Sequence, residues 1–123
     1  MESQNEGDRI ELKTNIELTI SQLKKAGIKK GDKVLDLGCA AGTTSRLMSQ
    51  IVGSSGQIVG VDFSEQRLEQ ARSCSDVGIE YRHGQGERTP ADDNEFDVSW
   101  SRFLFEYLLE PENVLSEMIR VTK

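Results

Sequence analysis

Two carboxylates stand beside small-residue turns in this 123-residue chain, and both could hold a polar ligand. Asp36 is the one acidic residue in the apolar run 34–37, and a turn of small residues at 38–42 follows it directly. Asp62 ends a second apolar run, 57–62, that is rich in β-branched residues. A strand that leads into a tight turn and then a helix can hold a nucleotide-like ligand at its carboxyl end. The pattern therefore predicts a cofactor site.

The first turn differs from the one that binds dinucleotides. The dinucleotide pattern G-x-G-x-x-G requires glycine at three positions, which Gly38, Ala40 and Thr43 occupy here. Asp36 would also disfavour a pyrophosphate, because like charges repel. The same carboxylate suits a ligand whose nearby end is cationic. A nicotinamide-dependent oxidoreductase is therefore the less favoured alternative.

At these residues the chain resembles motif I of the class I S-adenosylmethionine-dependent methyltransferases, D/E-x-G-x-G-x-G with frequent alanine at the middle glycine. That cofactor carries an ammonium and a sulfonium group and no phosphate. The resemblance implies that S-adenosylmethionine, or its product S-adenosylhomocysteine, lies over the loop 38–42, with the methionine end near Asp36 and the ribose on Asp62. The implied cofactor contacts are Asp36, Gly38, Cys39, Ala40, Gly42, Asp62, Phe63, Gln85, Gly86 and Ser101.

A third segment, residues 84–101, resembles the family stretch G-D-A-x-x-L-P-F-x-D-x-S-F-D-V, a loop that closes over the adenine before a fourth strand. Phe63 resembles the family residue that packs on one side of the adenine. Gln85 stands where the family usually has an aspartate that accepts a hydrogen bond from the adenine amino group. A glutamine carbonyl can still accept one such bond. We therefore expect adenine recognition that is retained and weakened.

The resemblance implies an enzyme that transfers a methyl group to an unidentified small-molecule acceptor. Positioning of donor and acceptor can supply much of the acceleration, and a base matters chiefly when the acceptor must lose a proton. Glu106 and Tyr107 follow the predicted fourth strand, where the family borders its acceptor site, and are the catalytic candidates. We interpret Cys39 as a small residue that fits a tight turn. The two cysteines lack the spacing of metal ligands, and we expect no metal site.

Alternating patterns along the chain predict the elements that position these residues. Helices are expected at 9–26, 43–52, 65–75 and from 111 onward, and strands at 33–38, 57–62, 79–82 and 96–101. Parallel strands joined by right-handed crossovers give the order 3-2-1-4. The expected fold is α/β, a Rossmann-like three-layer αβα sandwich with a mostly parallel sheet, in one domain that covers 1–123. Predicted inward-facing residues of the first and last helices are Ile16, Ile20, Leu23, Val114, Leu115, Met118 and Val121.

The resemblance covers residues 31–123 and ends before the family's strands five to seven. We expect a piece of a longer protein, or less readily a minimal form completed by association. The fourth strand would then be an edge with unpaired backbone groups beside Val98 and Trp100, which predicts a homo-oligomer through this edge. A non-catalytic cofactor-binding or assembly module is the alternative to an enzyme.

Composition limits the partners. Apolar residues make up 36% and charged residues 29% of the chain, and the formal net charge is -6. An acidic surface repels a nucleic-acid backbone, so we expect no nucleic-acid partner. No run approaches the roughly 20 apolar residues of a membrane span, and the first eight residues are polar and acidic, unlike a signal peptide. We expect a cytoplasmic protein that does not bind membranes.

Overall fold

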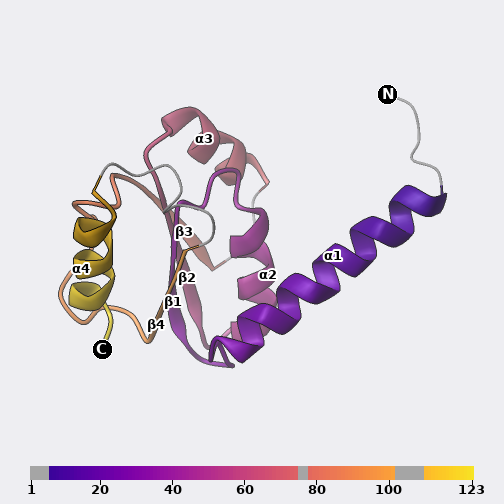
Figure 1. The fold of residues 1–123 in the computed structure, drawn as a ribbon, viewed down its shortest axis with the longest axis horizontal. Helices are drawn as coiled ribbons and strands as arrows, with labels where there is room; N and C mark the ends of the chain where they lie inside the picture. Colours follow the sequence, from indigo (N-terminus) through magenta and orange to yellow (C-terminus); the bar gives the residue numbers. More distant parts are fainter. Residues whose placement is uncertain (1–5, 75–77, 102–109) are drawn as a thin grey trace.

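The computed structural model describes residues 6–74, 78–101 and 110–123 of the chain. Four strands form one sheet in the order β3-β2-β1-β4, and all the pairings are parallel (Figure 1). The predicted strand order is therefore confirmed. The elements along the chain are α1 (Glu6–Lys25), β1 (Lys33–Leu37), α2 (Thr43–Val52), β2 (Gln57–Asp62), α3 (Glu65–Ser73), β3 (Ile79–His83), β4 (Val98–Ser101) and α4 (Pro111–Val121).

Helices cover both faces of the sheet, with α4 on one side and α1, α2 and α3 on the other (Figure 1). Successive side chains of a strand point to opposite faces, so β1 sends Leu35 and Leu37 toward α4 and Val34 toward α1 and α2. The α4 side of the core also contains Val59, Val61, Phe96, Val114 and Val121, and the opposite side contains Leu23, Ile28, Met48, Val52 and Ile58. This arrangement confirms the predicted three-layer sandwich.

Helix starts at the carboxyl ends of the strands follow from local sequence. Gly42 precedes α2 with φ 86° and ψ 12°, a left-handed conformation that favours glycine. The Ser64 Oγ accepts a hydrogen bond from the Arg67 N–H (3.3 Å), which confirms Ser64 as the N-cap of α3. Pro111 occupies the first turn of α4, as predicted. These starts place backbone N–H groups of α2 and α3 at one edge of the sheet.

The fourth strand begins later than the sequence predicts. It begins at Val98, whereas Phe96 forms an isolated parallel bridge with Thr122. The Phe96 N–H donates to the Val121 carbonyl (2.9 Å), and the Lys123 N–H donates to the Phe96 carbonyl (2.9 Å). Phe96 is therefore paired with the chain that leaves α4 and not with β1. Within the described residues, β4 itself lies at the end of the sheet order.

Helix boundaries and two buried positions also differ from the prediction. The first helix begins at residue 6 and not 9, and α3 ends at 73. Leu115 is 53% exposed because it lies one residue beyond the buried Val114 and so faces away from the sheet. Ile16 is exposed because the first part of α1 projects away from the domain (Figure 1). None of the described helices is both long and apolar enough to cross a membrane.

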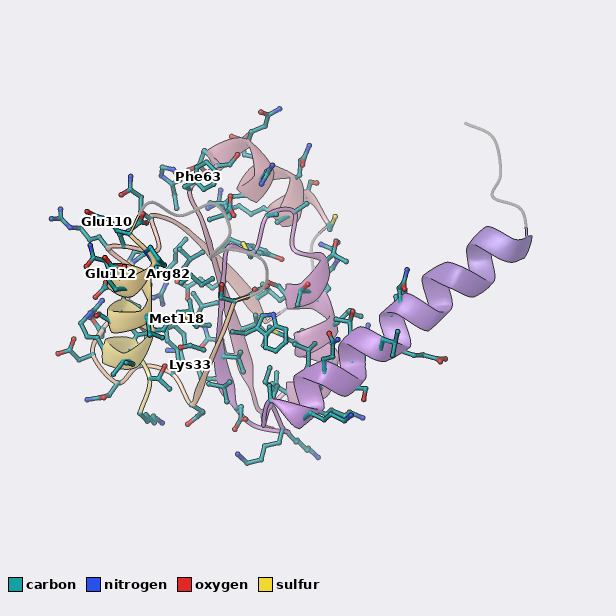
Figure 2. The ribbon with its side chains drawn as sticks, in the orientation of Figure 1. Lys33, Phe63, Arg82, Glu110, Glu112 and Met118 are labelled. Carbon is teal, nitrogen blue, oxygen red and sulfur yellow. The ribbon has the colours of Figure 1, made fainter. Side chains whose placement is uncertain are left out.

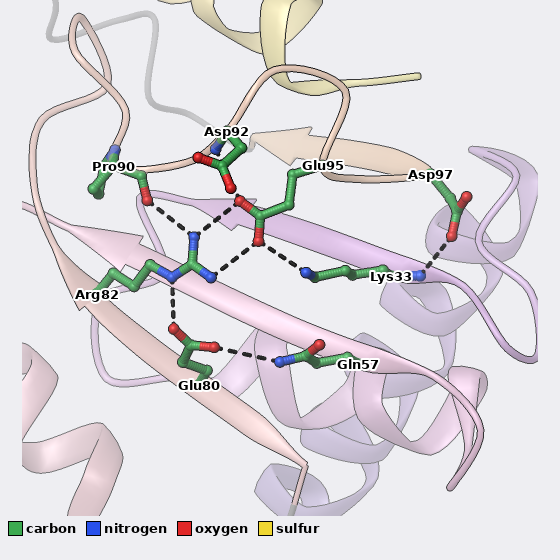
Figure 3. A network of polar contacts seen from close by, with 8 residues as sticks. All are labelled: Lys33, Gln57, Glu80, Arg82, Pro90, Asp92, Glu95 and Asp97. Atoms are coloured by element: carbon green, nitrogen blue, oxygen red, sulfur yellow. Dashed lines mark hydrogen bonds and ion pairs between the residues drawn. The ribbon is translucent and has the colours of Figure 1, made fainter.

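An ion network holds the loop between β3 and β4 to the sheet (Figure 3). The Glu95 carboxylate accepts hydrogen bonds from two nitrogens of Arg82 (3.2 and 3.0 Å) and from Lys33 Nζ (2.8 Å). Arg82 also donates to Glu80 (2.6 Å) and to the Pro90 carbonyl (3.0 Å). These cations, Arg82 first, lower the pKa of Glu95 to about 2. The loop is thus fixed by charge-assisted hydrogen bonds.

Candidate functional site

The loop 38–42 is tied to the end of β2. The N–H groups of Gly38 and Cys39 both donate to the Val61 carbonyl, at 2.7 and 3.0 Å, and the Ala40 N–H donates to Asp62 Oδ1 (3.2 Å). Gly38, Ala40 and Gly42 all have positive φ, at 78°, 51° and 86°. A Cβ added to Gly42 would clash with the hydroxyl oxygen of Tyr81, and the left-handed backbone there would strain any larger residue. The predicted tight turn is present, and it needs small residues.

Asp62 lies at the carboxyl end of β2, where it joins the loop 38–42 to the start of α3, and is only 4% exposed. Its Oδ1 accepts from the Ala40 N–H, and its Oδ2 accepts from the Ser64 N–H (3.0 Å). A carboxylate offers about four acceptor positions, so two bonds leave capacity for the hydroxyls of a ligand. Phe63 follows and is 67% exposed. Figure 2 shows Phe63 at the end of the sheet opposite Lys33, where the strands finish.

Asp36 lies beneath the same edge and is 3% exposed. Its Oδ2 accepts a hydrogen bond from the Ser45 hydroxyl (2.6 Å). Burial raises the pKa of Asp36 to about 6; the Ser45 bond opposes this shift, and the charge of Asp62 adds to it. In the described part of the chain, the hydrogen-bond partners of the two carboxylates are a hydroxyl and backbone N–H groups, none of them cationic. The site therefore favours a cationic ligand group.

Cys39 is buried in the turn and is not an activated nucleophile. Burial, followed by the charges of Asp36 and Asp62, raises the pKa of its thiol far above the usual range. A thiol that stays protonated is a poor nucleophile. A Cβ on Gly60 would lie 2.9 Å from Cys39 Sγ, so the space here is already filled. Cys39 thus serves as a small packing residue, in agreement with its interpretation from the sequence.

The turn that carries Gln85 and Gly86 lies beside Asp62. The Gly84 N–H donates to the Asp62 carbonyl (3.1 Å), and the Arg88 N–H closes the turn on the Gln85 carbonyl (3.2 Å). Gln85 is exposed and Gly86 is half-buried. Three segments far apart in sequence, 38–42, 62–63 and 84–86, therefore meet at the carboxyl edge of the sheet, as their positions after parallel strands predict.

His83 is a contact that sequence reasoning missed. Its Nε2 lies 2.9 Å from the Phe63 carbonyl oxygen, and its Nδ1 lies 3.6 Å from Glu65. The histidine therefore links the end of β3 to the residue that follows Asp62. The sequence placed His83 at the end of a predicted strand, which is a weak sign that it lies at this edge. Its pairing with Asp62 could not be predicted, because the register of the strands is seen only in the folded sheet.

Ser101 ends β4 opposite Leu37 of β1, at the same edge. Among the described residues, neither its buried hydroxyl nor the buried indole N–H of Trp100 has a hydrogen-bond partner. Glu106 and Tyr107 lie outside the described residues. Among the residues that are described, no group of three or more histidine, cysteine, aspartate or glutamate side chains could hold a metal ion. The edge as a whole offers two carboxylates, the exposed Phe63 and backbone groups.

Comparison with known proteins identifies relatives of this arrangement. Residues 34–123 match the family model of a methyltransferase domain. The chloroplastic 2-phytyl-1,4-beta-naphthoquinone methyltransferase of Arabidopsis thaliana is 38% identical over 106 residues, which cover 80% of this chain and 40% of that protein. The demethylmenaquinone methyltransferase of Staphylococcus aureus is 35% identical over 103 residues, which cover 82% and 43%.

A solved structure agrees with these relatives. The crystal structure of a SAM-dependent methyltransferase from Aquifex aeolicus matches with a TM-score of 0.79 at 30% sequence identity, over 85% of this chain and 58% of that one. The chain spans about two fifths of the length of the two curated relatives, at 40% and 43%.

Proposed function

This chain belongs to the S-adenosylmethionine-dependent methyltransferases, because its residues 34–123 match the methyltransferase domain model and its fold matches a SAM-dependent methyltransferase. From this premise we propose a function. The proposed function is transfer of a methyl group from S-adenosylmethionine to a small aromatic acceptor of the quinone class. When bound, this cofactor supplies a methyl group already activated on a sulfonium. The protein therefore needs to bind, orient and exclude water more than it needs a dedicated base.

One observation carries the proposal: two buried carboxylates at the cofactor edge have no cationic partner within the described residues. Burying a carboxylate without a cation is unfavourable, and the raised pKa of Asp36 reflects that cost. A ligand with an ammonium group would relieve it, whereas a pyrophosphate would increase it. The residues present thus fit S-adenosylmethionine better than they fit a dinucleotide.

In the proposed binding mode, each part of the edge has one task. Asp36 would favour the ammonium group, and Asp62 would accept from the ribose hydroxyls with the acceptor capacity that its backbone bonds leave. Phe63 would pack on the adenine, and Gln85 would accept from its amino group. The loop residues Gly38, Cys39, Ala40 and Gly42, together with Gly86 and Ser101, would line the remaining surface.

The acceptor class rests on the named activities of the curated relatives, which are methyltransferases of 2-phytyl-1,4-beta-naphthoquinone and of demethylmenaquinone. The test is release of S-adenosylhomocysteine from S-adenosylmethionine in the presence of reduced naphthoquinones that carry no methyl group at the ring position next to the side chain. Turnover that depends on the naphthoquinol, and is absent with phenol, supports the proposal. A chain that binds S-adenosylhomocysteine but turns over none of these acceptors would instead be the non-catalytic binding module.

A further inference from the structure

The loop between β3 and β4 begins at the cofactor edge and then crosses the α4 side of the sheet. It contains residues 84–97 and has no helix or strand of its own. Its first turn carries Gln85 and Gly86. A loop of this length without regular structure can be held only by its side chains and by its neighbours. The position of the turn therefore depends on the contacts that anchor the residues after it.

Helix α4 holds the part of the loop just after the turn through the backbone of Thr89. The Thr89 N–H donates to Glu117 Oε1 (2.7 Å), and Arg120 Nη2 donates to the Thr89 carbonyl (3.1 Å). Arg120 also donates to Glu117 Oε2 (2.7 Å) and to Asp93 (2.7 Å). Hydrogen bonds with an ionised partner are stronger than neutral ones. Both main-chain polar groups of Thr89 are thus fixed to one ion pair on α4.

The side chain of Thr89 connects this anchor to the turn. Its hydroxyl donates to the Gly86 carbonyl (3.1 Å), and the residue is only 4% exposed. On its other side Gly86 has little space, because an added Cβ would lie 3.3 Å from Val114 of α4. Gly86 is therefore held between the Thr89 hydroxyl and the packed surface of α4.

A second arginine, Arg82, binds the residue after Thr89, Pro90, from the β3 side of the loop. Arg82 of β3 donates to the Pro90 carbonyl (3.0 Å) and binds Glu95 with two nitrogens (Figure 3). The successive carbonyls of Thr89 and Pro90 are thus each bound by an arginine from a different element. The residues after the turn are therefore fixed by two arginines. The turn at 85–88 depends instead on the Thr89 hydroxyl.

Thr89 departs from the family pattern. In the family stretch that the loop resembles, the residue before the proline is leucine, and here it is Thr89. A leucine could fill the same buried position, but it could not donate to the Gly86 carbonyl. A buried threonine hydroxyl needs a hydrogen-bond partner, and the partner that it finds belongs to the turn.

We propose that Thr89 is a positioning residue for the adenine-side turn: Glu117 and Arg120 hold its backbone, and its hydroxyl holds Gly86 and with it Gln85. This inference rests on the proposed function, in which the turn contacts the adenine. Thr89 is buried and would not itself touch the cofactor. It acts by fixing the backbone from which the contact is made.

The first test is ligand affinity, measured calorimetrically with S-adenosylhomocysteine and with 5′-methylthioadenosine, which keeps the adenine and ribose but lacks the amino-acid end. Thr89→Val keeps the branched shape and removes the hydroxyl, so we expect both ligands to bind about fivefold to tenfold more weakly. Thr89→Ser keeps the hydroxyl and should bind within about twofold of the native chain. Equal affinities for Thr89→Val and the native chain, or a loss confined to S-adenosylhomocysteine, would overturn the inference.

Glu95→Gln is the matched control for a merely structural role. It weakens the Arg82 anchor of the same loop and leaves the bonds of Thr89 in place, so it should lower stability without changing either affinity. If Glu95→Gln weakened ligand binding as much as Thr89→Val does, loop stability in general would be responsible and the specific role of Thr89 would be wrong.

Amide hydrogen exchange in the ligand-free chain tests the same link without the cofactor. Thr89→Val should speed exchange of the Arg88 amide, which closes the turn on Gln85, and Thr89→Ser should not. The Arg46 amide at the start of α2 serves as the internal reference. Unchanged exchange at Arg88 would overturn the inference. A folded chain that shows the exchange effect but does not bind S-adenosylhomocysteine would instead refute the proposed function.

Discussion

Replacing Asp36 by asparagine should stabilise the folded chain at neutral pH. Asp36 is buried, and its pKa rises from 3.8 to about 6 on folding. One pKa unit corresponds to 1.36 kcal/mol, so a shift of about two units makes the ionised carboxylate cost about 3 kcal/mol of folding free energy. Asparagine has nearly the same size and can still accept from the Ser45 hydroxyl. We therefore expect Asp36→Asn to raise the free energy of unfolding by about 1–3 kcal/mol at pH 7.5.

The pH dependence of this gain gives the sharper test. Because the pKa is higher in the folded state, the folded chain binds more protons than the unfolded chain between pH 3.8 and about 6. The stability penalty of Asp36 is therefore complete above this window and disappears below it. Urea unfolding of both chains at several pH values between about 4 and 7.5 should show the gain of Asp36→Asn shrinking as the pH falls. A variant that is less stable at pH 7.5, or a gain independent of pH, would refute the reasoning.

Asp97→Asn is a control of opposite sign. The Lys33 N–H and then Lys123 lower the pKa of Asp97, so its charge contributes stability above its unfolded pKa and loses it as the pH falls. The substitution should therefore destabilise the chain at neutral pH, and the difference should disappear in acid. A common sign for both variants would indicate a general effect of reduced negative charge.

Three further predictions concern ligand affinity, stability and association. In the native chain, affinity for S-adenosylhomocysteine should fall by up to tenfold per pH unit below about pH 6, because only ionised Asp36 favours the ammonium group. Asp36→Asn should not show this fall, and parallel curves of affinity against pH for the two chains would contradict the prediction. Glu95→Gln should lower the free energy of unfolding by about 1–3 kcal/mol at neutral pH. The difference should fade between pH 4.5 and about 2, because the pKa of Glu95 is lowered in the folded chain. An unchanged urea midpoint at neutral pH would show that the ion network does not stabilise the chain. The 123-residue chain should self-associate through the edge of β4 beside Val98 and Trp100, and a monomer at high concentration by light scattering would exclude this.

The central strands could be predicted from the sequence because they carry their own signals. Parallel strands buried on both faces are continuous apolar runs, and the runs ending at Leu37 and Asp62 are followed by glycine or by the N-cap Ser64. The carboxyl ends of such strands share one edge, so the meeting of the loop 38–42 with Asp62 also followed from the sequence.

Contacts between distant segments could not be predicted in this way. Phe96 fits a strand by its apolar pattern, and only the chain returning from α4 decides that it pairs with Thr122. The bonds from Glu117 and Arg120 to Thr89 join residues about thirty positions apart, with no local pattern that links them. The burial of Asp36 was implied by its apolar run, whereas the lack of a cationic partner required the three-dimensional arrangement.

The most direct test of the proposed cofactor edge is a calorimetric titration of the folded chain with S-adenosylhomocysteine, with NADH as the matched control and Asp62→Ala as the variant. We expect selective binding of S-adenosylhomocysteine with a stoichiometry near one, and a loss of about 1–3 kcal/mol of binding free energy in Asp62→Ala from the missing charge-assisted bonds to the ribose. A folded native chain that binds NADH as well as S-adenosylhomocysteine, or a folded Asp62→Ala chain of unchanged affinity, would contradict it.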